Sequence, residues 1–85
     1  MALFLIERNF AEQLEVDAEA AAEVKRVNAE EGILWLYSFL RADNKKTYCL
    51  YEAPNPEALR RAARRLNIPA DVIVEVSTVR PEHYV

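Results

Sequence analysis

The sequence predicts one α+β domain in which four strands and two helices follow one another in the order βαββαβ. Three observations lead to this prediction. The chain has 85 residues, which suits a single small domain. Its residues are 52% apolar, which is ample for a folded core. Four short segments rich in β-forming residues are separated by two segments with helical character.

The first strand and the first helix are predicted within residues 2–32. Residues 2–10 begin as a continuous apolar run, which is typical of a strand buried on both faces. Asp17 is a suitable N-cap for a helix over residues 18–31, where apolar residues recur at three- and four-residue intervals. Gly32 can adopt a positive φ, so we expect it to end this helix.

A hairpin is predicted next. Residues 33–40 are dense in aromatic and aliphatic side chains, and residues 46–53 form the returning strand. The polar segment between them contains Asp43 and Asn44, which favour turns. These two strands are therefore expected to pair antiparallel.

The second helix is predicted over residues 57–66, with Asn55 as its cap and Pro56 in the first turn. The last strand covers residues 72–79 and ends before Pro81. We expect one domain over residues 1–85, of which residues 82–85 form a loose tail.

This order of elements fits two right-handed split βαβ units, which is the ferredoxin-like arrangement. It predicts a four-stranded antiparallel sheet with both helices on one face.

Alternation along the strands divides their side chains into two sets, one for each face of the sheet. We assign the plain hydrophobic set to the face that the helices cover; it contains Phe4, Ile6, Leu34, Leu36, Leu50, Val72, Val74 and Val76. The opposite set mixes apolar residues with groups that ionise or form hydrogen bonds; it contains Leu3, Leu5, Glu7, Trp35, Tyr37, Phe39, Cys49, Tyr51, Ile73, Glu75 and Ser77.

The second face is too apolar to meet water, so we expect it to be an interface. A second copy of the chain, related by a two-fold axis, would cover it and close a dimeric α/β barrel around a cavity. The candidate cavity residues are Glu7, Trp35, Tyr37, Cys49, Tyr51 and Glu75. For the aromatic residues at positions 35, 37 and 39, packing in the dimer core is the expected role and lining a ligand cavity is the alternative.

Glu7 is the most informative of these residues, because it follows an apolar run on a strand expected at the centre of the sheet. A carboxylate there needs a partner, which Tyr51 or an arginine would supply. Its structural role would be a core hydrogen bond or a dimer ion pair. Its functional role would be a general base or a ligand with a raised pKa.

The net charge of −3 argues against a nucleic-acid partner. An arginine cluster at residues 60–65 is expected to be a solvated helix face paired with Glu52 or Glu57. A phosphate or acidic-partner site is the alternative for this cluster.

Cys49 is the only cysteine, so the chain has no internal disulfide. The apolar run at residues 1–6 is too short for a membrane span or the core of a signal peptide. A cytoplasmic protein is therefore expected. Cys49 itself is expected as a small buried hydrophobe, with metal ligation or a reactive thiol as alternatives.

Four motifs along the chain resemble a known family of small bacterial proteins of unknown function, typified by a nickel-binding, nickel-responsive protein. They are Ile6-Glu7-Arg8-x-Phe10, Trp35-x-x-Ser38-Phe39, Tyr48-Cys49-x-Tyr51-x-Ala53-Pro54 and Pro69-Ala70-Asp71. The resemblance covers nearly the whole chain. It implies a ferredoxin-like fold, a homodimer and nickel as a possible cofactor.

The chain departs from the family pattern at two positions where the family usually has histidine. These positions hold Tyr37 and Ala62. Nickel favours imidazole and thiolate ligands, so only a weak set of candidates is left, formed by Cys49, Glu7 and His83. The resemblance therefore implies a metal site that is not carried over intact.

Three functions compete at this point. The first is a small dimeric protein that binds a small molecule, or weakly a metal, between its paired sheets. The second is a small barrel enzyme, an isomerase or monooxygenase, with Glu7 and Tyr37 or Tyr51 as its acid–base pair. The third is an interaction module without a ligand.

Overall fold

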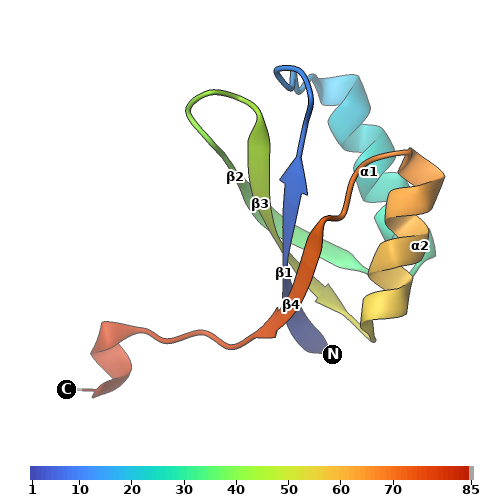
Figure 1. The fold of residues 1–85 in the computed structure, drawn as a ribbon. Coiled ribbons are helices and arrows are strands. Elements are labelled where there is room, and N and C mark those ends of the chain that lie inside the picture. The colour runs from blue at the N-terminus through green and yellow to red at the C-terminus, as the bar shows by residue number, and fades with distance from the viewer. Residues whose placement is uncertain (85) are drawn as a thin grey trace.

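The computed structural model describes residues 1–84 and contains the predicted elements in the predicted order (Figure 1). They are β1 (Ala2–Asn9), α1 (Ala18–Glu30), β2 (Leu34–Leu40), β3 (Lys46–Ala53), α2 (Pro56–Leu66), β4 (Val72–Val76) and a short 3₁₀ helix η1 (Pro81–Tyr84). The last strand is three residues shorter than predicted. Of the predicted tail, residue 85 lies outside the described residues.

The four strands form one antiparallel sheet in the order β2-β3-β1-β4. Both helices lie on the same side of this sheet (Figure 1). The chain therefore has the ferredoxin-like fold, as the sequence predicted. The long strands β1 and β3 form the centre, and the face without helices is open.

The ends of the helices follow the predicted chemistry. The side chains of Asp17 and Asn55 accept hydrogen bonds from the backbone N–H groups of Ala20 and Ala58, at 2.7 and 2.9 Å. Gly32 follows the C-cap residue Glu31 of α1 and has a φ of 73°, which glycine adopts without strain. Asn67 has a φ of 54° and ends α2 in the same way.

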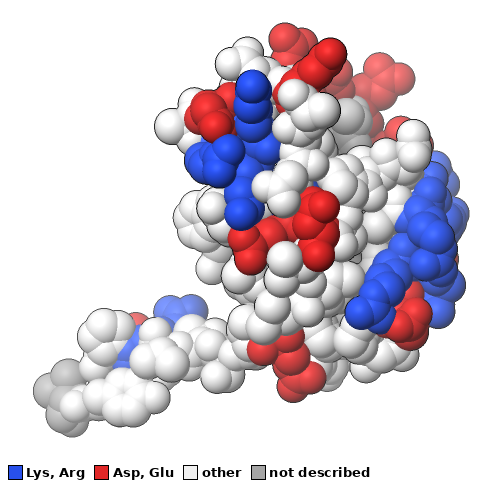
Figure 2. Space-filling view, in the orientation of Figure 1, with Lys and Arg blue, Asp and Glu red and all other residues white. Residues whose placement is uncertain are grey.

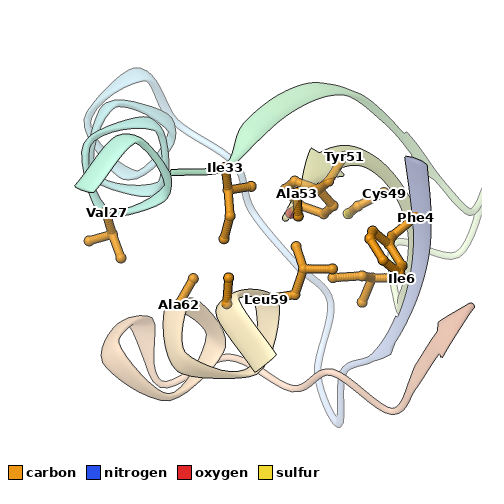
Figure 3. Packing of buried hydrophobic residues seen from close by; sticks show 10 residues of the cluster. Phe4, Ile6, Val27, Ile33, Cys49, Tyr51, Ala53, Leu59 and Ala62 are labelled. Atoms are coloured by element: carbon orange, nitrogen blue, oxygen red, sulfur yellow. The ribbon is translucent and has the colours of Figure 1, made fainter. Parts of the chain in front are cut away.

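The hydrophobic core lies between the helices and the sheet (Figure 3). Ile6 at the centre of β1 is fully buried, and Leu59 points toward it from α2 (Figure 3). Cys49 and Tyr51 of β3 point into the same core. Burial of these side chains supplies most of the free energy that holds the helices on the sheet.

This placement corrects the predicted division of the sheet. In the β1–β3 register, Ile6 lies opposite Cys49 and Phe4 lies opposite Tyr51, so these four side chains share the face that the helices cover. The assignment of Cys49 and Tyr51 to the open face was therefore wrong. Leu50 was also misassigned, because it lies opposite Leu5 on the open face.

The same correction applies to β4. Val72, Val74 and Val76 lie opposite Glu7, Leu5 and Leu3 and so belong to the open face. Ile73 lies opposite Ile6 and packs against the core. Glu75, opposite Phe4, is exposed at the edge of the sheet. The prediction therefore placed the valines of β4 and the residues between them on the wrong faces. Valine suits either face of an edge strand, so its presence did not distinguish them.

A register shift in β2 explains why simple alternation also failed there. Trp35 lies opposite Tyr51, whereas Tyr37 lies opposite Leu50, so the pairing slips at the residue between them. Trp35 and Tyr37 therefore lie on opposite faces. Trp35 faces the helices, contrary to the prediction, while Tyr37 and Phe39 lie on the open face as predicted. Leu34 also lies on the open face, so its assignment to the helix-covered face was wrong. Leu36 lies at the slip itself and is exposed rather than buried under the helices.

The arginine cluster of α2 forms ion pairs with the end of α1. Arg61 and Arg65 lie 2.9 and 3.1 Å from the carboxylate of Glu31, and Arg65 also contacts Glu30. Arg60 pairs with Glu57 within α2, as one of the predicted pairings requires. Basic residues line this side of the molecule in the space-filling view (Figure 2). Exposed pairs of this kind stabilise the fold only modestly.

After β4 the chain extends away from the domain and ends in η1 (Figure 1). The side chains of this C-terminal arm are exposed, including those of Val79, His83 and Tyr84. Neither helix of residues 1–84 has the length and apolar character required to cross a membrane.

Candidate functional site

A pocket of about 370 Å³ lies between α1 and the part of the sheet that faces it. Three small or branched residues of α1 form one wall, namely Ala20, Ala21 and Val24. The β1–α1 connection and neighbouring segments add apolar walls from Phe10, Leu14, Val16, Leu40 and Ile68. The polar wall is the sheet itself, which contributes Arg8, Trp35, Ser38, Thr47, Cys49 and Tyr51. The volume is within the range of small-molecule sites.

Arg8 is the most unusual residue of this pocket, because it is an arginine with only 5% of its surface exposed. Its Nη1 donates to the backbone oxygen of Pro69 at 2.5 Å, and its Nη2 donates to the hydroxyl oxygen of Tyr51 at 3.0 Å. The guanidinium also lies 5.8 Å from the centre of the Tyr51 ring. Neutral groups therefore hold this cation in place.

Trp35 and Ser38 form a second polar contact in the pocket wall. The indole Nε1 of Trp35 donates to the hydroxyl oxygen of Ser38 at 2.9 Å. The register shift in β2 brings both residues to the same face, although they are three residues apart. On β3, the thiol of Cys49 lies 3.5 Å from the hydroxyl of Thr47.

Burial raises the pKa of the Tyr51 hydroxyl above its ordinary value of 10.0, and the nearby positive charge of Arg8 offsets part of this effect. The phenol is therefore neutral at physiological pH. It keeps its proton while its oxygen accepts the hydrogen bond from Arg8.

The structure brings only half of the predicted cavity residues together. Trp35, Cys49 and Tyr51 line the pocket within one copy of the chain. Glu7 and Tyr37 lie on the opposite face of the sheet, and Glu75 lies exposed on the edge strand. The predicted acid–base pair of Glu7 with Tyr51 is therefore not assembled.

Glu7 has a different partner from the two that were predicted. Its carboxylate lies 2.8 Å from Nζ of Lys46, at the end of β3. The hydrogen bond that the Lys46 ammonium donates to this carboxylate raises the pKa of Lys46. The pair lies on the open face, where both side chains are partly exposed. Glu7 thus has the structural role of an ion pair within one copy.

Arg8 was not among the predicted site residues, although the sequence contained a signal for it. Alternation along β1 places Arg8 on the same face as Phe4 and Ile6, both of which were correctly assigned to the core. A charged residue at the next inward position of a buried strand needs a special explanation. Ser38 stood in one of the family motifs but was not named as a site residue, and nothing in the local sequence of Thr47 separates it from ordinary strand residues.

The fold and the pocket together define a small α+β domain with a ligand-sized site beneath one helix. The family model described as "Nickel responsive protein SCO4226-like" matches residues 4–76, and the chain belongs to this SCO4226-like family. This confirms the predicted family resemblance.

The crystal structure of SCO4226 from Streptomyces coelicolor A3(2) is similar to this chain, with a TM-score of 0.80 and 25% sequence identity. The similarity covers 93% of this chain and 100% of the SCO4226 chain. No curated protein matches the sequence.

The family description raises the question of nickel, and the residues of this chain do not fit a metal site. Within residues 1–84, no group of three or more histidine, cysteine or acidic residues is arranged to hold a metal ion. The three weak candidates lie in different parts of the molecule. Cys49 is buried under the helices, Glu7 lies on the open face, and His83 lies on the C-terminal arm. Tyr37 and Ala62 add no metal-binding nitrogen.

Proposed function

We propose that this chain is a small binding protein whose ligand occupies the pocket between α1 and the sheet of a single copy. The pocket itself is the observation that supports the proposal. It has the volume of a small-molecule site, and its apolar walls surround a few fixed polar groups, which is the composition typical of such sites. This location differs from the cavity between two paired sheets that the sequence suggested.

A ligand screen with a pocket-filling variant tests this proposal. Trp35 is the only tryptophan and lines the pocket, so its fluorescence reports on binding there. A ligand that binds the folded state should raise the melting temperature and change this fluorescence together. Replacing Ala21 by leucine, which fills the pocket, should abolish both effects.

The matched control is Ala22→Leu, one residue further on the same helix, because Ala22 is exposed and does not line the pocket. Ligands should act on Ala22→Leu as they do on the unmodified chain. If ligands act equally on Ala21→Leu, the site is elsewhere and the proposal is wrong.

We further propose that the open face of the sheet pairs with a second copy of the chain. The large side chains on this face include Leu34, Tyr37, Phe39, Val72 and Val74, and they are 40–62% exposed in one copy. The edge-to-face contact of Tyr37 with Phe39 gives the patch a fixed aromatic centre, with ring centroids 5.6 Å apart. An apolar surface of this kind is typical of an interface.

Light scattering with Phe39→Glu tests this pairing. Burying an unpaired carboxylate in the interface should convert a dimer into a monomer without unfolding it. Ala22→Glu adds the same charge on an exposed helix position and should leave the dimer intact. A chain that is monomeric at high concentration before any substitution would refute this part of the proposal.

A further inference from the structure

We infer that the ligand of this pocket is an apolar molecule that carries a carboxylate, and that Arg8 binds the carboxylate. The inference rests on the proposed function and names the chemical class of its ligand. It follows from the charge of the pocket, from its hydrogen-bonding groups and from its apolar walls.

The charge of Arg8 has no partner within the structure. In residues 1–84, no carboxylate oxygen lies within 4.0 Å of the Arg8 guanidinium, which is the distance limit for an ion pair. The arginines that do pair with carboxylates have side chains at least 39% exposed, so water already solvates their charge. They are Arg26, Arg41, Arg60, Arg61, Arg65 and Arg80. A guanidinium stays charged even when buried, and a buried charge without a counter-ion is costly. An anion in the pocket removes this cost.

A hydroxyl group of the pocket wall also requires an acceptor. The oxygens of Tyr51 and Ser38 accept hydrogen bonds from Arg8 and Trp35, whose N–H groups act only as donors. The Ser38 hydroxyl donates no hydrogen bond within the described part of the chain, so its proton remains for a ligand, whereas the Tyr51 hydroxyl also interacts with the side chain of Cys49. The pocket wall therefore offers a positive charge and a spare O–H donor, which suit the oxygens of a carboxylate.

The remaining walls exclude a small, fully polar anion as the best ligand. Phosphate would satisfy Arg8 but would leave the apolar surfaces of Phe10, Leu14, Val24 and Leu40 uncovered. An alkyl or aromatic body attached to the carboxylate covers them. The small side chains of Ala20 and Ala21 leave room for this body beneath α1.

Glu15 is the only acidic residue that lines the pocket, and it is exposed on the β1–α1 connection. Among the residues that line the pocket, its carboxylate is the group that would compete with a ligand for Arg8. The experiment therefore includes this residue.

The test compares octanoate with octan-1-ol, which has the same chain length without the charge, and with inorganic phosphate. Binding to the full chain is followed by the fluorescence of Trp35. Octanoate should bind about tenfold to a hundredfold more tightly than octan-1-ol, as a charge-assisted hydrogen bond predicts. Phosphate should leave the fluorescence unchanged.

Three variants locate the preference for the carboxylate. Arg8→Gln should remove it, so that octanoate and octan-1-ol bind alike. Arg64→Gln, at an exposed arginine outside the pocket, should preserve it. Glu15→Gln should leave octanoate binding equal or tighter, since it removes the competing carboxylate.

Equal binding of octanoate and octan-1-ol to the unmodified chain would overturn the inference even if Arg8→Gln did not fold, while the proposed binding function would stand. Weaker binding of octanoate to the Glu15→Gln variant would also overturn the inference, because the carboxylate of octanoate would then not be held at Arg8. A pocket that binds no compound of the wider screen would refute the proposed function itself.

Discussion

Arg8 and Tyr51 lie on adjacent strands, and Nη2 of the arginine donates to the hydroxyl oxygen of the tyrosine at 3.0 Å. Both side chains are buried under the helices. Because Arg8 lies opposite Thr47 in the register, its side chain must extend along the sheet to reach Tyr51. This contact holds the Arg8 guanidinium in the wall of the pocket. Substitutions that break it should therefore affect both the stability of the core and ligand binding.

Replacing Tyr51 by phenylalanine should lower the free energy of unfolding by about 1–3 kcal/mol, because Arg8 loses a buried acceptor while the volume of the ring is kept. Urea denaturation measures the loss. Tyr48→Phe is the control, since Tyr48 lies on the open face and should change stability little. Equal effects of the two substitutions would contradict the importance of this contact.

The corrected division of the sheet predicts opposite outcomes at Ile6 and Val74. Ile6→Ala should cost about 2–5 kcal/mol, because it leaves a cavity in the core. Val74→Ala should cost about 1 kcal/mol or less in a monomer, because this valine lies on the open face. Urea denaturation at low protein concentration gives both values. A larger loss at Val74 would restore the original assignment of β4.

The end of α1 should be sensitive to substitution of Gly32 for a purely conformational reason. No atom lies within 4 Å of a side chain added there, but the φ of 73° is unfavourable for other residues. Gly32→Ala should therefore lower stability by about 1–2 kcal/mol. Gly32→Asn should lower it less, since asparagine tolerates this conformation. Thermal denaturation that showed no difference from glycine would refute the role of this turn.

The ion pairs between the helices should weaken in acid. Hydrogen bonds from Arg61 and Arg65 hold the pKa of Glu31 below its ordinary value of 4.5. A carboxylate with a lowered pKa stabilises the folded state above 4.5, and this contribution is lost as the pH falls through the folded-state pKa. Glu31→Gln should thus lower the melting temperature at neutral pH and have little effect well below pH 4.5.

Glu23→Gln, on the same helix but outside these ion pairs, is the control for the pH experiment. It should change the melting temperature little at any pH. Because the Glu31 pairs are exposed, added salt should also shrink the effect of Glu31→Gln. A difference that persists unchanged into acid would show that charge is not its cause.

Nickel should not bind through Cys49, because the buried thiol lacks the further ligands that a metal site requires. Titration with Ni²⁺ should therefore produce no thiolate-to-nickel absorption band. Cys49→Ser should titrate like the unmodified chain. A band that is present in the unmodified chain and lost in this variant would mean that Cys49 does ligate the metal.

The order of elements could be read from the sequence because its signals are local. Helix caps at Asp17 and Asn55, the turn at Gly32 and the hairpin at residues 41–45 act within a few residues of themselves. The family motifs are local in the same sense. These features were sufficient to predict the ferredoxin-like fold.

The faces of the strands could be predicted only in part. On β1, the apolar run ends in Glu7 on one side and Arg8 on the other, and the assignment of Phe4 and Ile6 was correct. On β3, Leu50 was assigned to the wrong face, although the charged residues Lys46 and Glu52 lie on the same open face and carry a signal that was not used in the prediction. The aromatic and aliphatic residues at the remaining positions suit either face, so they did not indicate which face is covered by the helices.

The sequence by itself determined the elements, their order and the apolar character of the strands. Only the tertiary structure decided which side chains meet. The slip between Trp35 and Tyr37 exchanges the faces of part of β2, and no local pattern encodes it. The pocket lies between α1 and residues of β1, β2 and β3, and Arg8 reaches Tyr51 across 43 residues of sequence. Such contacts depend on packing between distant segments, which alternation along a single strand cannot reveal.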